Sequence, residues 1–589
     1  MNQQNKALII ACFTFLLFII HATAQQRIMI NQLGYYIDAP KIAVVTGQTT
    51  TTDFFVITTD ASKVIVFKGK LSEQKQSQNS STITRIADFS DFKKAGTYII
   101  AVPNVGDSYT FTIGNNAQHA VAVSSLKGFY FQRVSMPLEE KYAGKWARSV
   151  GHADTAVLMH SSAASDKRPE ATIISSPGGW YDAGDYNKYI VNSGITMGTL
   201  LSAYEDFTIY FDTLKTNIPE STDKIPDLLN EVLYNLRWML TMQDPNDGGV
   251  YHKCTNAAFD GMVMPGVTKL PRYVMQKGTA ATLDFAAVTA QAARILKKFE
   301  KQVPGLSDSC LKASQYAWQW TLKNPAVAYN QNILNQKFQP KITTGAYGDN
   351  LFEDEWYWAA CELYATTQDE QYYKMITERI NDKMSLPSWS NVGMLGHYTL
   401  LRNEKKLQKH SPDVIDMKKR FILFADSLIQ HVNENAFETL IGQSKKDFIW
   451  GSNAVAANQS IVLINAYLIT KEKKYIDKAL TNLDYILGRN ATGYCFVTGL
   501  GTKSTMHPHH RQSVADGINE PVPGLLAGGP NPGMQDKCHY DFTEPETAYA
   551  DIDCAYASNE IAINWNAPLV YLSNAIEALQ YIVGYSSKK

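Results

Sequence analysis

The chain of 589 residues carries almost no net charge, and its basic residues are scattered. Its 55 lysines and arginines balance 56 acidic residues, for a formal net charge of −1. This balance argues against a surface that binds nucleic acid or another polyanion. The sequence has neither a GxGxxG motif nor a P-loop, so no nucleotide cofactor is indicated. An apolar content of 45% is too high for a disordered chain.

Cysteine is scarce as well. The chain has seven cysteines, and no pair is arranged as CxxC. Cys12 lies in the N-terminal segment, and the other cysteines are widely spaced, which favours buried thiols over a disulfide framework. Cys538 and Cys554 flank one loop and are the pair best placed for a disulfide.

The N-terminal apolar run, residues 7–20, is too short to cross a membrane. Lys6 precedes it, and Ala22-Thr23-Ala24 follows as a small-residue cleavage site, which is typical of a signal peptide. We therefore expect residues 1–24 to be removed on export. The remaining protein is expected to be periplasmic or secreted, without a membrane span, and to act as a monomer.

Residues 25–114 differ in pattern from residues 115–589. The first region has short β-rich runs separated by turn-rich segments, which predict an all-β immunoglobulin-like sandwich. The predicted strands are residues 27–31, 41–46, 54–58, 64–67, 82–87, 97–102 and 109–113. In the second region apolar residues recur at three- and four-residue spacings, which predicts helices. These are residues 120–130, 194–205, 226–242, 283–299, 308–323, 354–365, 418–434, 460–469, 474–487 and 568–583.

Two segments far apart in the sequence hold carboxylates among aromatic residues, glycines and amides. Residues 178–189 read GGWYDAGDYNKY, and residues 555–568 read AYASNEIAINWNAP. Neither segment has the periodicity of a solvated helix or strand face. Cleavage of a glycosidic bond needs one protonated carboxyl group and one ionised carboxylate, in different environments. These segments therefore predict a glycosidase.

From about residue 116 to the end, the chain resembles glycoside hydrolase family 9, the cellulase family. Three motifs carry the resemblance. The Asp-Ala-Gly-Asp block of 182–185 is one, and the Val-Thr-Gly stretch of 496–501 leading to Pro-His-His-Arg at 508–511 is another. The third is a C-terminal pattern formed by Asp551, Tyr556, Glu560, Asn566 and Ala567. The resemblance implies an (α/α)6 barrel and an inverting mechanism, and many members carry an immunoglobulin-like module before the barrel. Cys495 departs from the pattern, where Ser or Thr is more usual.

The resemblance also implies roles for the carboxylates. Asp185 would be the base that deprotonates a water molecule, Asp182 would help to hold that water, and Glu560 would be the general acid. An apolar wall that includes Tyr556 could keep Glu560 protonated. The alternative for Asp185 is a structural cap on a helix that begins near Tyr186.

Other site residues follow from the same resemblance. His509 and Arg511 match a pair that contacts the sugar, and Tyr556, His252, Trp389 and Trp450 are further candidates for substrate binding. The tryptophans could instead be core residues. The closely spaced His507, His509 and His510 could suggest a metal site, but no cysteine or carboxylate ligand stands beside them.

Two groups of residues bear on metal binding. Asp349, Asp354 and Glu355 gather oxygen ligands at the start of a predicted helix, as similar family members do for calcium. The alternative is stabilisation of the helix N-terminus by negative charge. Relatives with the immunoglobulin-like module often bind zinc through cysteines and histidines. Here those positions hold Val134, Gly151 and Tyr181, which leaves His152 alone, so we predict no zinc. No cofactor is expected to be required for the chemistry.

The function that these features favour is inverting, endo-acting hydrolysis of β-1,4 bonds in cellulose-like or mixed-linkage β-glucan. An exo-acting enzyme, or one adapted to branched xyloglucan, is the first alternative. Ala454 and Val455 support a difference in the sugar subsites, because some relatives have a polar and an aromatic residue there. A non-catalytic carbohydrate-binding protein is a second alternative, although all three carboxylates are present. A polysaccharide lyase on the same barrel is a third, but it would need a Tyr or His base.

Overall fold

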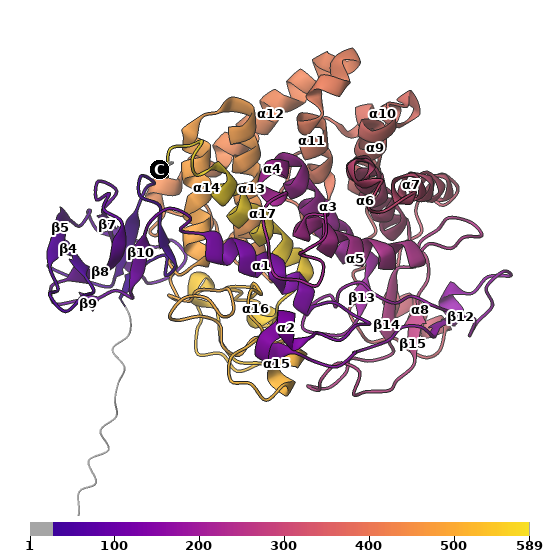
Figure 1. Ribbon diagram of the computed structural model, residues 1–589, viewed down its shortest axis with the longest axis horizontal. Coiled ribbons are helices and arrows are strands. Elements are labelled where there is room, and N and C mark those ends of the chain that lie inside the picture. Colours follow the sequence, from indigo (N-terminus) through magenta and orange to yellow (C-terminus); the bar gives the residue numbers. More distant parts are fainter. Residues whose placement is uncertain (1–26, 588–589) are drawn as a thin grey trace, which may run out of the picture.

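The computed structural model describes residues 27–587 and divides them into a β-rich N-terminal part and a large helical part (Figure 1). The predicted fold class, a β-sandwich followed by an (α/α)6 barrel, is confirmed. The predicted signal peptide lies outside the described residues. Within residues 27–587, none of the helices has the length and apolar character needed to span a bilayer.

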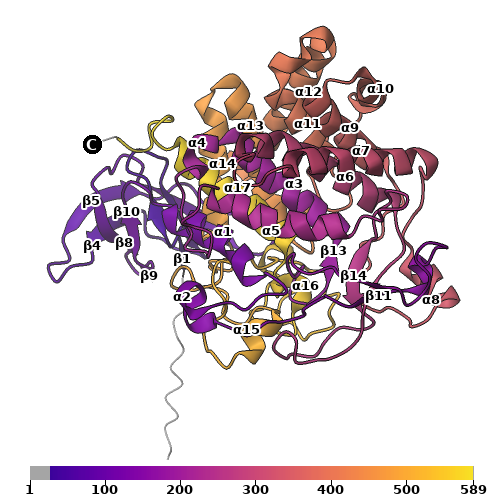
Figure 2. The ribbon, with the colours of Figure 1, turned by 45° about the vertical axis from the view of Figure 1, so that its right-hand side comes forward.

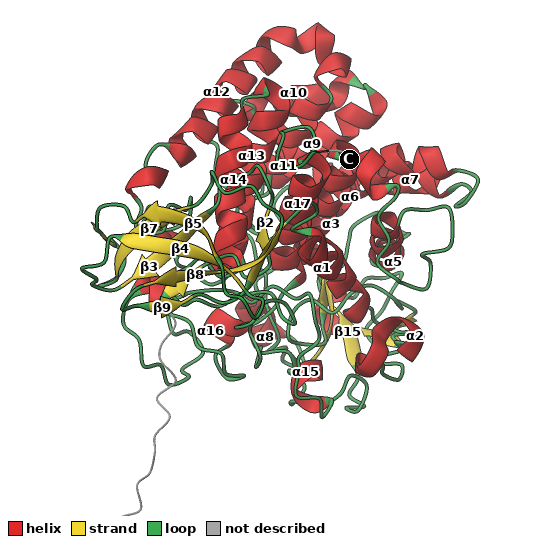
Figure 3. Ribbon diagram, turned by 60° about the vertical axis from the view of Figure 1, so that its left-hand side comes forward, coloured by secondary structure: helices red, strands yellow, loops and turns green. Residues whose placement is uncertain are grey.

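The N-terminal part is a sandwich of two sheets (Figure 3, yellow). One sheet has the order β1-β3-β7-β6 and the other β2-β10-β8-β4-β5, with β9 paired to β8. Alternating side chains fill the space between them: in β8 (Gly96–Val102), Tyr98, Ile100 and Val102 point inward. The remaining strands are β1 (Ile28–Met29), β2 (Gly34–Tyr35), β3 (Ile42–Thr46), β4 (Asp53–Thr58), β5 (Ile65–Lys70), β6 (Lys75–Gln76), β7 (Ile83–Asp88), β9 (Gly106–Asp107) and β10 (Phe111–Ile113).

The long helices of the second part form two concentric rings. The inner ring consists of α3 (Ile190–Asp206), α6 (Thr279–Leu296), α9 (Glu353–Thr367), α11 (Gly393–Arg402), α13 (Ser452–Thr470) and α17 (Ile563–Leu579). The outer ring consists of α1 (His119–Phe131), α5 (Asp227–Thr241), α7 (Leu306–Lys323), α10 (Glu370–Arg379), α12 (Ser411–Ile429) and α14 (Lys473–Ile486). Inner helices pack on their ring neighbours: α3 contacts both α6 and α17, and α9 contacts both α6 and α11. They are buried on nearly every side, whereas α14 and α7 each present one largely polar face to solvent.

Several elements were not among the predictions. They include α10, α11 and the short α8 (Gln331–Lys337). A small sheet of order β12-β11-β15-β14-β13 is also new, and its strands are β11 (Val157–Met159), β12 (Ile173–Ile174), β13 (Lys188–Tyr189), β14 (Lys253–Asn256) and β15 (Arg272–Val274). Figures 1 and 2 show β13 and β14 at the same end of the barrel as α15 (Arg511–Ala515) and α16 (Tyr556–Asn559). This end therefore gathers the segments that carry the sequence motifs.

The sandwich packs directly on the barrel. Met29, Val44 and Ile86 form one buried cluster with Ala436 and Phe437 of the helical part. Polar contacts flank this cluster: the Asn31 amide donates to Asp484 at 2.8 Å, and the Thr84 hydroxyl donates to the carbonyl of residue 436 at 2.7 Å. Because these groups are buried and paired, separating the two parts would expose apolar surface and leave polar groups unsatisfied.

The cysteines are distributed as the sequence indicates. Cys538 and Cys554 form a disulfide within one loop. The four other cysteines within the described part of the chain are free and buried, namely Cys254, Cys310, Cys361 and Cys495.

Candidate active site

Three sequence motifs meet at one end of the barrel. Ala183 forms an antiparallel bridge with Ala562, and the amide of Ile563 donates to the carbonyl of Asp182 at 2.8 Å. His509 pairs in parallel with Glu560. The loop that carries both aspartates is thereby hydrogen-bonded to the segment that carries the glutamate, and the histidine-arginine motif lies against both.

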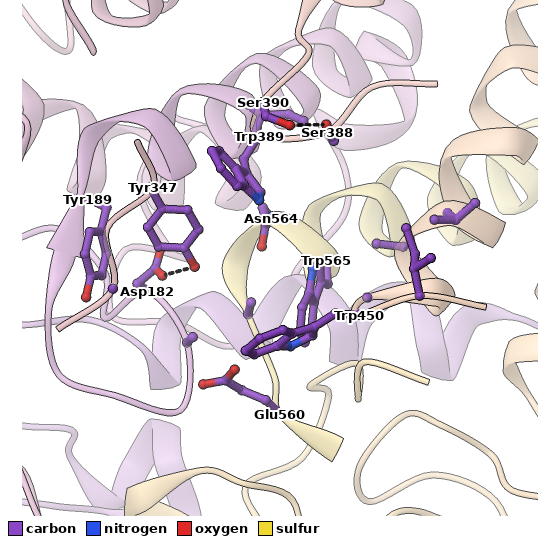
Figure 4. Close-up of a pocket in the computed structure, with 18 of the residues that line it drawn as sticks. Asp182, Tyr189, Tyr347, Ser388, Trp389, Ser390, Trp450, Glu560, Asn564 and Trp565 are labelled. Atoms are coloured by element: carbon purple, nitrogen blue, oxygen red, sulfur yellow. Dashed lines mark hydrogen bonds between the residues drawn. The ribbon is translucent and has the colours of Figure 1, made fainter. Parts of the chain in front are cut away.

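Asp182 is buried and held by two side chains. The Asn192 amide of α3 donates to one carboxyl oxygen at 2.5 Å, and the Tyr347 hydroxyl donates to the other at 2.8 Å (Figure 4). Burial and, second, the neighbouring charge of Asp185 raise the pKa of Asp182 to about 8. Asp182 is therefore protonated at neutral pH, which removes the cost of placing two like charges side by side.

Asp185 lies on the same loop and is also buried. Its carboxylate accepts hydrogen bonds from the Asn187 amide and from the Tyr189 hydroxyl, the latter at 3.2 Å. The helix that follows begins at Ile190, with Tyr189 as its N-terminal cap residue. The alternative that Asp185 caps a helix near Tyr186 is therefore wrong, since two strand residues intervene before the helix starts.

Glu560 follows α16 in extended backbone and projects toward the pocket (Figure 4). Burial raises its pKa well above the usual value for glutamate, and the nearby carboxylate of Asp185 raises it further. Arg511 opposes this effect. The site thus provides a carboxyl group that holds its proton at a higher pH than a solvated glutamate would, as a general acid requires.

A cavity of about 510 Å³ joins these carboxyl groups. Its walls are largely apolar and aromatic, and a volume in this range is typical of a ligand site. The lining includes Asp182, Asp185, Glu560, Tyr189, Tyr347, Phe259, Trp389, Trp450, Ala454, Val455, Asn564 and Trp565. Figure 4 shows Trp389, Trp450 and Trp565 around the space into which Glu560 projects. Trp389 and Trp450 therefore line the cavity and are not core residues.

A protein-family model described as glycosyl hydrolase family 9 matches residues 119–573, most of the chain. The chain belongs to glycosyl hydrolase family 9. A second model, the cellulase N-terminal ig-like domain, matches residues 23–107. The family assignment confirms the resemblance seen in the motifs, and it makes the protein a glycoside hydrolase.

Comparison with individual proteins supports the same family assignment. The chain is 48% identical to the xyloglucan-specific endo-beta-1,4-glucanase BoGH9A of Bacteroides ovatus over 554 residues, which is 94% of each chain. It is 33% identical to endoglucanase D of Acetivibrio thermocellus, over 95% of this chain and 84% of that one. A solved structure of a Bacteroides ovatus family 9 protein superposes with a TM-score of 0.90 at 46% identity, over 94% of this chain and 99% of that one.

The other residues expected to touch substrate lie at the edge of the cavity or behind it. Tyr556 packs against Trp450 and His509, with ring centroids 5.6 and 5.4 Å apart. The His252 ring is buried, stacks on Tyr329 and pairs with the carbonyl of residue 346 at 2.7 Å. Burial lowers the pKa of His252 to about 3, so it is neutral. His252 thus contacts the residue before Tyr347 and does not line the cavity.

Arg511 is buried and faces backbone carbonyls. Its guanidinium donates to the carbonyl of Gly184 at 2.8 Å and to that of Asp260 at 2.9 Å. These bonds connect the loop that carries Asp185 with the segment that follows β14. The structure therefore gives Arg511 a bracing position beside the site.

The sequence did not single out Tyr347, Tyr189, Asn564 or Phe259, whereas Trp565 was expected beside Glu560 and lines the cavity. Tyr347 lies between Tyr189 and Trp389, with ring centroids 4.8 and 5.3 Å away, and its φ of 45° places it in the left-handed region. That conformation is costly for an aromatic residue and is kept where the surroundings impose it, often at functional sites. The tyrosine between two glycines at 345–348 was the signal that could have revealed it.

The expected calcium ligands gather around the start of α9, where Glu355 and Asp354 lie in the first turn. Asp284 of α6 joins them: it is fully buried, and neither carboxyl oxygen has a hydrogen-bond partner among residues 27–587. Burial raises the pKa of Asp284 well above its usual value, and the charges of Asp354 and Asp349 add to this effect. No set of three or more His, Cys, Asp or Glu side chains within residues 27–587 is arranged as a metal site. Calcium also accepts carbonyl and water oxygens, so this crowded acidic group still suits it chemically.

The positions that hold zinc in some relatives do not suit a metal here. The Tyr181 hydroxyl bonds to Nδ1 of His152 at 2.9 Å, and a Cβ atom on Gly151 would lie only 2.3 Å from that oxygen. Val134 packs against Tyr181 in an apolar cluster. These four positions therefore supply one imidazole and no thiolate, which does not match a structural zinc site.

Proposed function

We propose that the protein is an inverting endo-β-1,4-glucanase. The observation that carries this proposal is the meeting of Asp182, Asp185 and Glu560 in one cavity lined by tryptophans. The carboxyl groups stand in different environments, and a pair of carboxyl groups flanking the bond is what glycoside hydrolysis requires. Family membership supports the same reaction.

Each group has a role in a single displacement. Glu560 gives its proton to the glycosidic oxygen as that bond breaks, and the oxygen leaves as a hydroxyl group. Asp185 takes a proton from a water molecule, which attacks the anomeric carbon from the opposite face. Asp182, which bears its own proton at neutral pH, helps to hold the water. The configuration at the anomeric carbon is inverted because only one displacement occurs.

Xyloglucan is the substrate that we propose. The similarity to BoGH9A supports it, since that protein is named as specific for xyloglucan and the match covers 94% of both chains. Ala454 and Val455 line the cavity near the start of α13 with small side chains. Small residues here favour a substrate with side branches, because a branch needs space beside the glucan backbone.

Hydrolysis of tamarind xyloglucan, carboxymethylcellulose and mixed-linkage barley β-glucan tests the substrate and the mode together. An endo-acting xyloglucanase lowers the viscosity of xyloglucan much faster than it releases reducing ends, and it acts more slowly on the unbranched glucans. Viscosity that falls only in proportion to reducing ends would indicate exo action. Preference for an unbranched glucan would overturn the xyloglucan assignment but leave the glucanase assignment intact.

We further propose the boundaries and location indicated by the sequence. Residues 1–24 act as the export signal, 25–114 as the immunoglobulin-like module and 115–589 as the catalytic domain, in a periplasmic or secreted monomer. Calcium is proposed as a structural ion at Asp349, Asp354, Glu355 and the additional Asp284. When bound it would neutralise the repulsion among these carboxylates.

A further inference from the structure

Phe259 is an aromatic residue of the cavity wall that has no role in the account above. It lies in the segment between β14 and β15 and lines the same cavity as Asp182 and Asp185. Its side chain is 46% exposed. A phenylalanine this open forgoes nearly half of the stabilisation that full burial would give. Its place on the wall of the cavity that holds the carboxyl groups points to a bound ligand as the partner of the exposed face.

One face of the Phe259 ring is covered by the protein. The guanidinium of Arg511 lies over the ring, 5.5 Å from its centroid. A cation over an aromatic face is an attractive contact. The same guanidinium donates to the carbonyls of Asp260 and Gly184. Arg511 therefore supports the ring from behind and joins the Phe259 segment to the loop that carries Asp185.

The backbone around Phe259 is fixed by further contacts. One carboxyl oxygen of Asp260 accepts from the Asn256 amide at 3.1 Å, and the other lies 3.6 Å from Nε2 of His152. The Tyr186 hydroxyl donates to the carbonyl of Val263 at 2.7 Å. Because these bonds immobilise the segment before any ligand arrives, a molecule that stacks on the ring would not have to order it.

The free face of a fixed aromatic ring suits the flat C–H face of a pyranose. Sugar C–H groups are weakly positive, and the face of the ring carries negative charge, so the two attract while water is excluded. We propose that Phe259 forms a sugar-binding subsite beside Asp185, where a glucose unit of the glucan backbone stacks on the ring. This proposal rests on the proposed glucanase function and extends it with a residue that positions the chain.

The same segment also exposes Val267 and Leu270, which are 62% and 50% accessible. An apolar surface for a partner protein would use all of these residues and would not need the ring of Phe259 to lie in the catalytic cavity. The two interpretations differ in one measurable respect. If Phe259 forms a sugar subsite, KM for glucan depends on the aromatic ring at position 259. If it belongs to a partner surface, KM does not depend on this ring.

The test compares Phe259→Leu and Phe259→Trp with the wild-type enzyme on soluble xyloglucan and barley β-glucan. Leucine keeps apolar volume over Arg511 but removes the flat face, so KM for the polymer should rise about five- to tenfold, with kcat within twofold. Tryptophan keeps a flat face and should leave KM near the wild-type value. Titration calorimetry with xyloglucan oligosaccharides, in a Glu560→Gln background, should show the same weakening for leucine and none for tryptophan.

Several results would overturn the subsite. A KM for the polymer that Phe259→Leu leaves unchanged would do so. This is the result expected if the segment binds a partner protein and not the substrate. Equal losses for leucine and tryptophan would show that packing of the segment matters and stacking does not, and thermal unfolding of both variants would reveal that loss of packing. If the wild-type enzyme hydrolyses no β-glucan, the proposed function fails and the subsite with it. If the wild type is active and Phe259→Leu is indistinguishable from it, only the subsite fails.

Discussion

Ala183 and Ala562 form an antiparallel backbone bridge, although they lie near opposite ends of the catalytic domain in sequence. Each belongs to a segment that carries catalytic candidates: Ala183 lies between Asp182 and Asp185, and Ala562 is two residues after Glu560. Backbone hydrogen bonds cannot stretch by more than a few tenths of an ångström without being lost. The bridge therefore sets the spacing of the two segments before substrate binds.

The hydroxyl of Tyr347 should matter for turnover. It donates to Asp182 at 2.8 Å from a loop on the other side of the pocket. Removing it by Tyr347→Phe should lower kcat by up to about tenfold, because losing a hydrogen bond to an uncharged carboxyl group costs about 0.5–1.5 kcal/mol. Steady-state kinetics on xyloglucan measures this loss. Tyr316→Phe, on the outer helix α7 away from the cavity, is the matched control, and a kcat equal to that of the control would refute the role.

Activity should persist to higher pH than an ordinary glutamate would allow. Glu560 acts in its protonated form, and burial raises its pKa well above the usual 4.5. Activity should therefore be lost only as pH rises through this raised value. The pH profile of kcat/KM should show its alkaline limb far above pH 4.5. An alkaline limb near pH 4.5 would mean that Glu560 is solvated and is not the acid.

Asp182→Asn should stabilise the folded protein at alkaline pH while it impairs activity. The pKa of Asp182 is about 8 in the folded state and 3.8 as a free side chain. The folded state thus binds this proton more tightly, and wild-type stability falls as pH rises from about 4 through 8. Asparagine has no proton to lose, so the variant avoids this loss of stability. Each unit by which the folded-state pKa exceeds the unfolded-state pKa corresponds to about 1.4 kcal/mol. Thermal unfolding should show a variant that is more stable than wild type at pH 9, with a smaller difference at pH 4.

The opposite trend would contradict the buried, protonated state of Asp182. If Asp182→Asn lost stability relative to wild type as pH rose, ionised Asp182 would be the favoured form in the folded protein.

Calcium should raise the unfolding temperature through the acidic group at the start of α9. An ion present at about 100 times its Kd stabilises the folded state by about 2.7 kcal/mol. A chelator should lower the unfolding temperature and added calcium should restore it, whereas Glu355→Gln should remove most of the response. Glu434→Gln changes an exposed glutamate outside this group and should keep the full response. An unfolding temperature indifferent to chelator and calcium would exclude the site.

Deleting residues 25–114 should destabilise the barrel more than it alters the products. The interface contains the cluster around Phe437 and the buried bond from Asn31 to Asp484, which deletion would expose. The unfolding temperature should fall by a few degrees, since about 1 kcal/mol shifts it by roughly 2–4 °C in a domain of 150–250 residues and by less in a larger one. A truncated barrel as stable as the full chain would show that the module does not brace it. Asn31→Ala, a milder change, should lower stability in the same direction.

The sequence predicted the elements whose pattern is local. Strands such as Gly96–Val102 alternate buried and half-buried residues, and the long inner helices repeat apolar residues at helical spacing. The strands of the small sheet have only two to four residues, which is too few for periodicity to show. The helix Gly393–Arg402 was missed because it is short and has two glycines.

The site residues also differ in whether a local sequence pattern predicts them. The carboxylates stand in motifs that can be read directly, and the structure brings all three into one cavity. Tyr347 and Phe259 sit in loops, and their proximity to Asp182 and Asp185 depends on the tertiary fold. For Arg511, residue type predicts a strong donor but not its acceptor, which here is backbone.

The most direct test of the central claim is the configuration of the first product. Proton NMR of xyloglucan oligosaccharide hydrolysis resolves the α- and β-anomers before they equilibrate. Inverting hydrolysis by Glu560 and Asp185 predicts that the α-anomer forms first, and that Glu560→Gln and Asp185→Asn each reduce the rate by about 10²–10⁴-fold. The β-anomer as first product, or a variant with wild-type activity, would contradict the assigned roles.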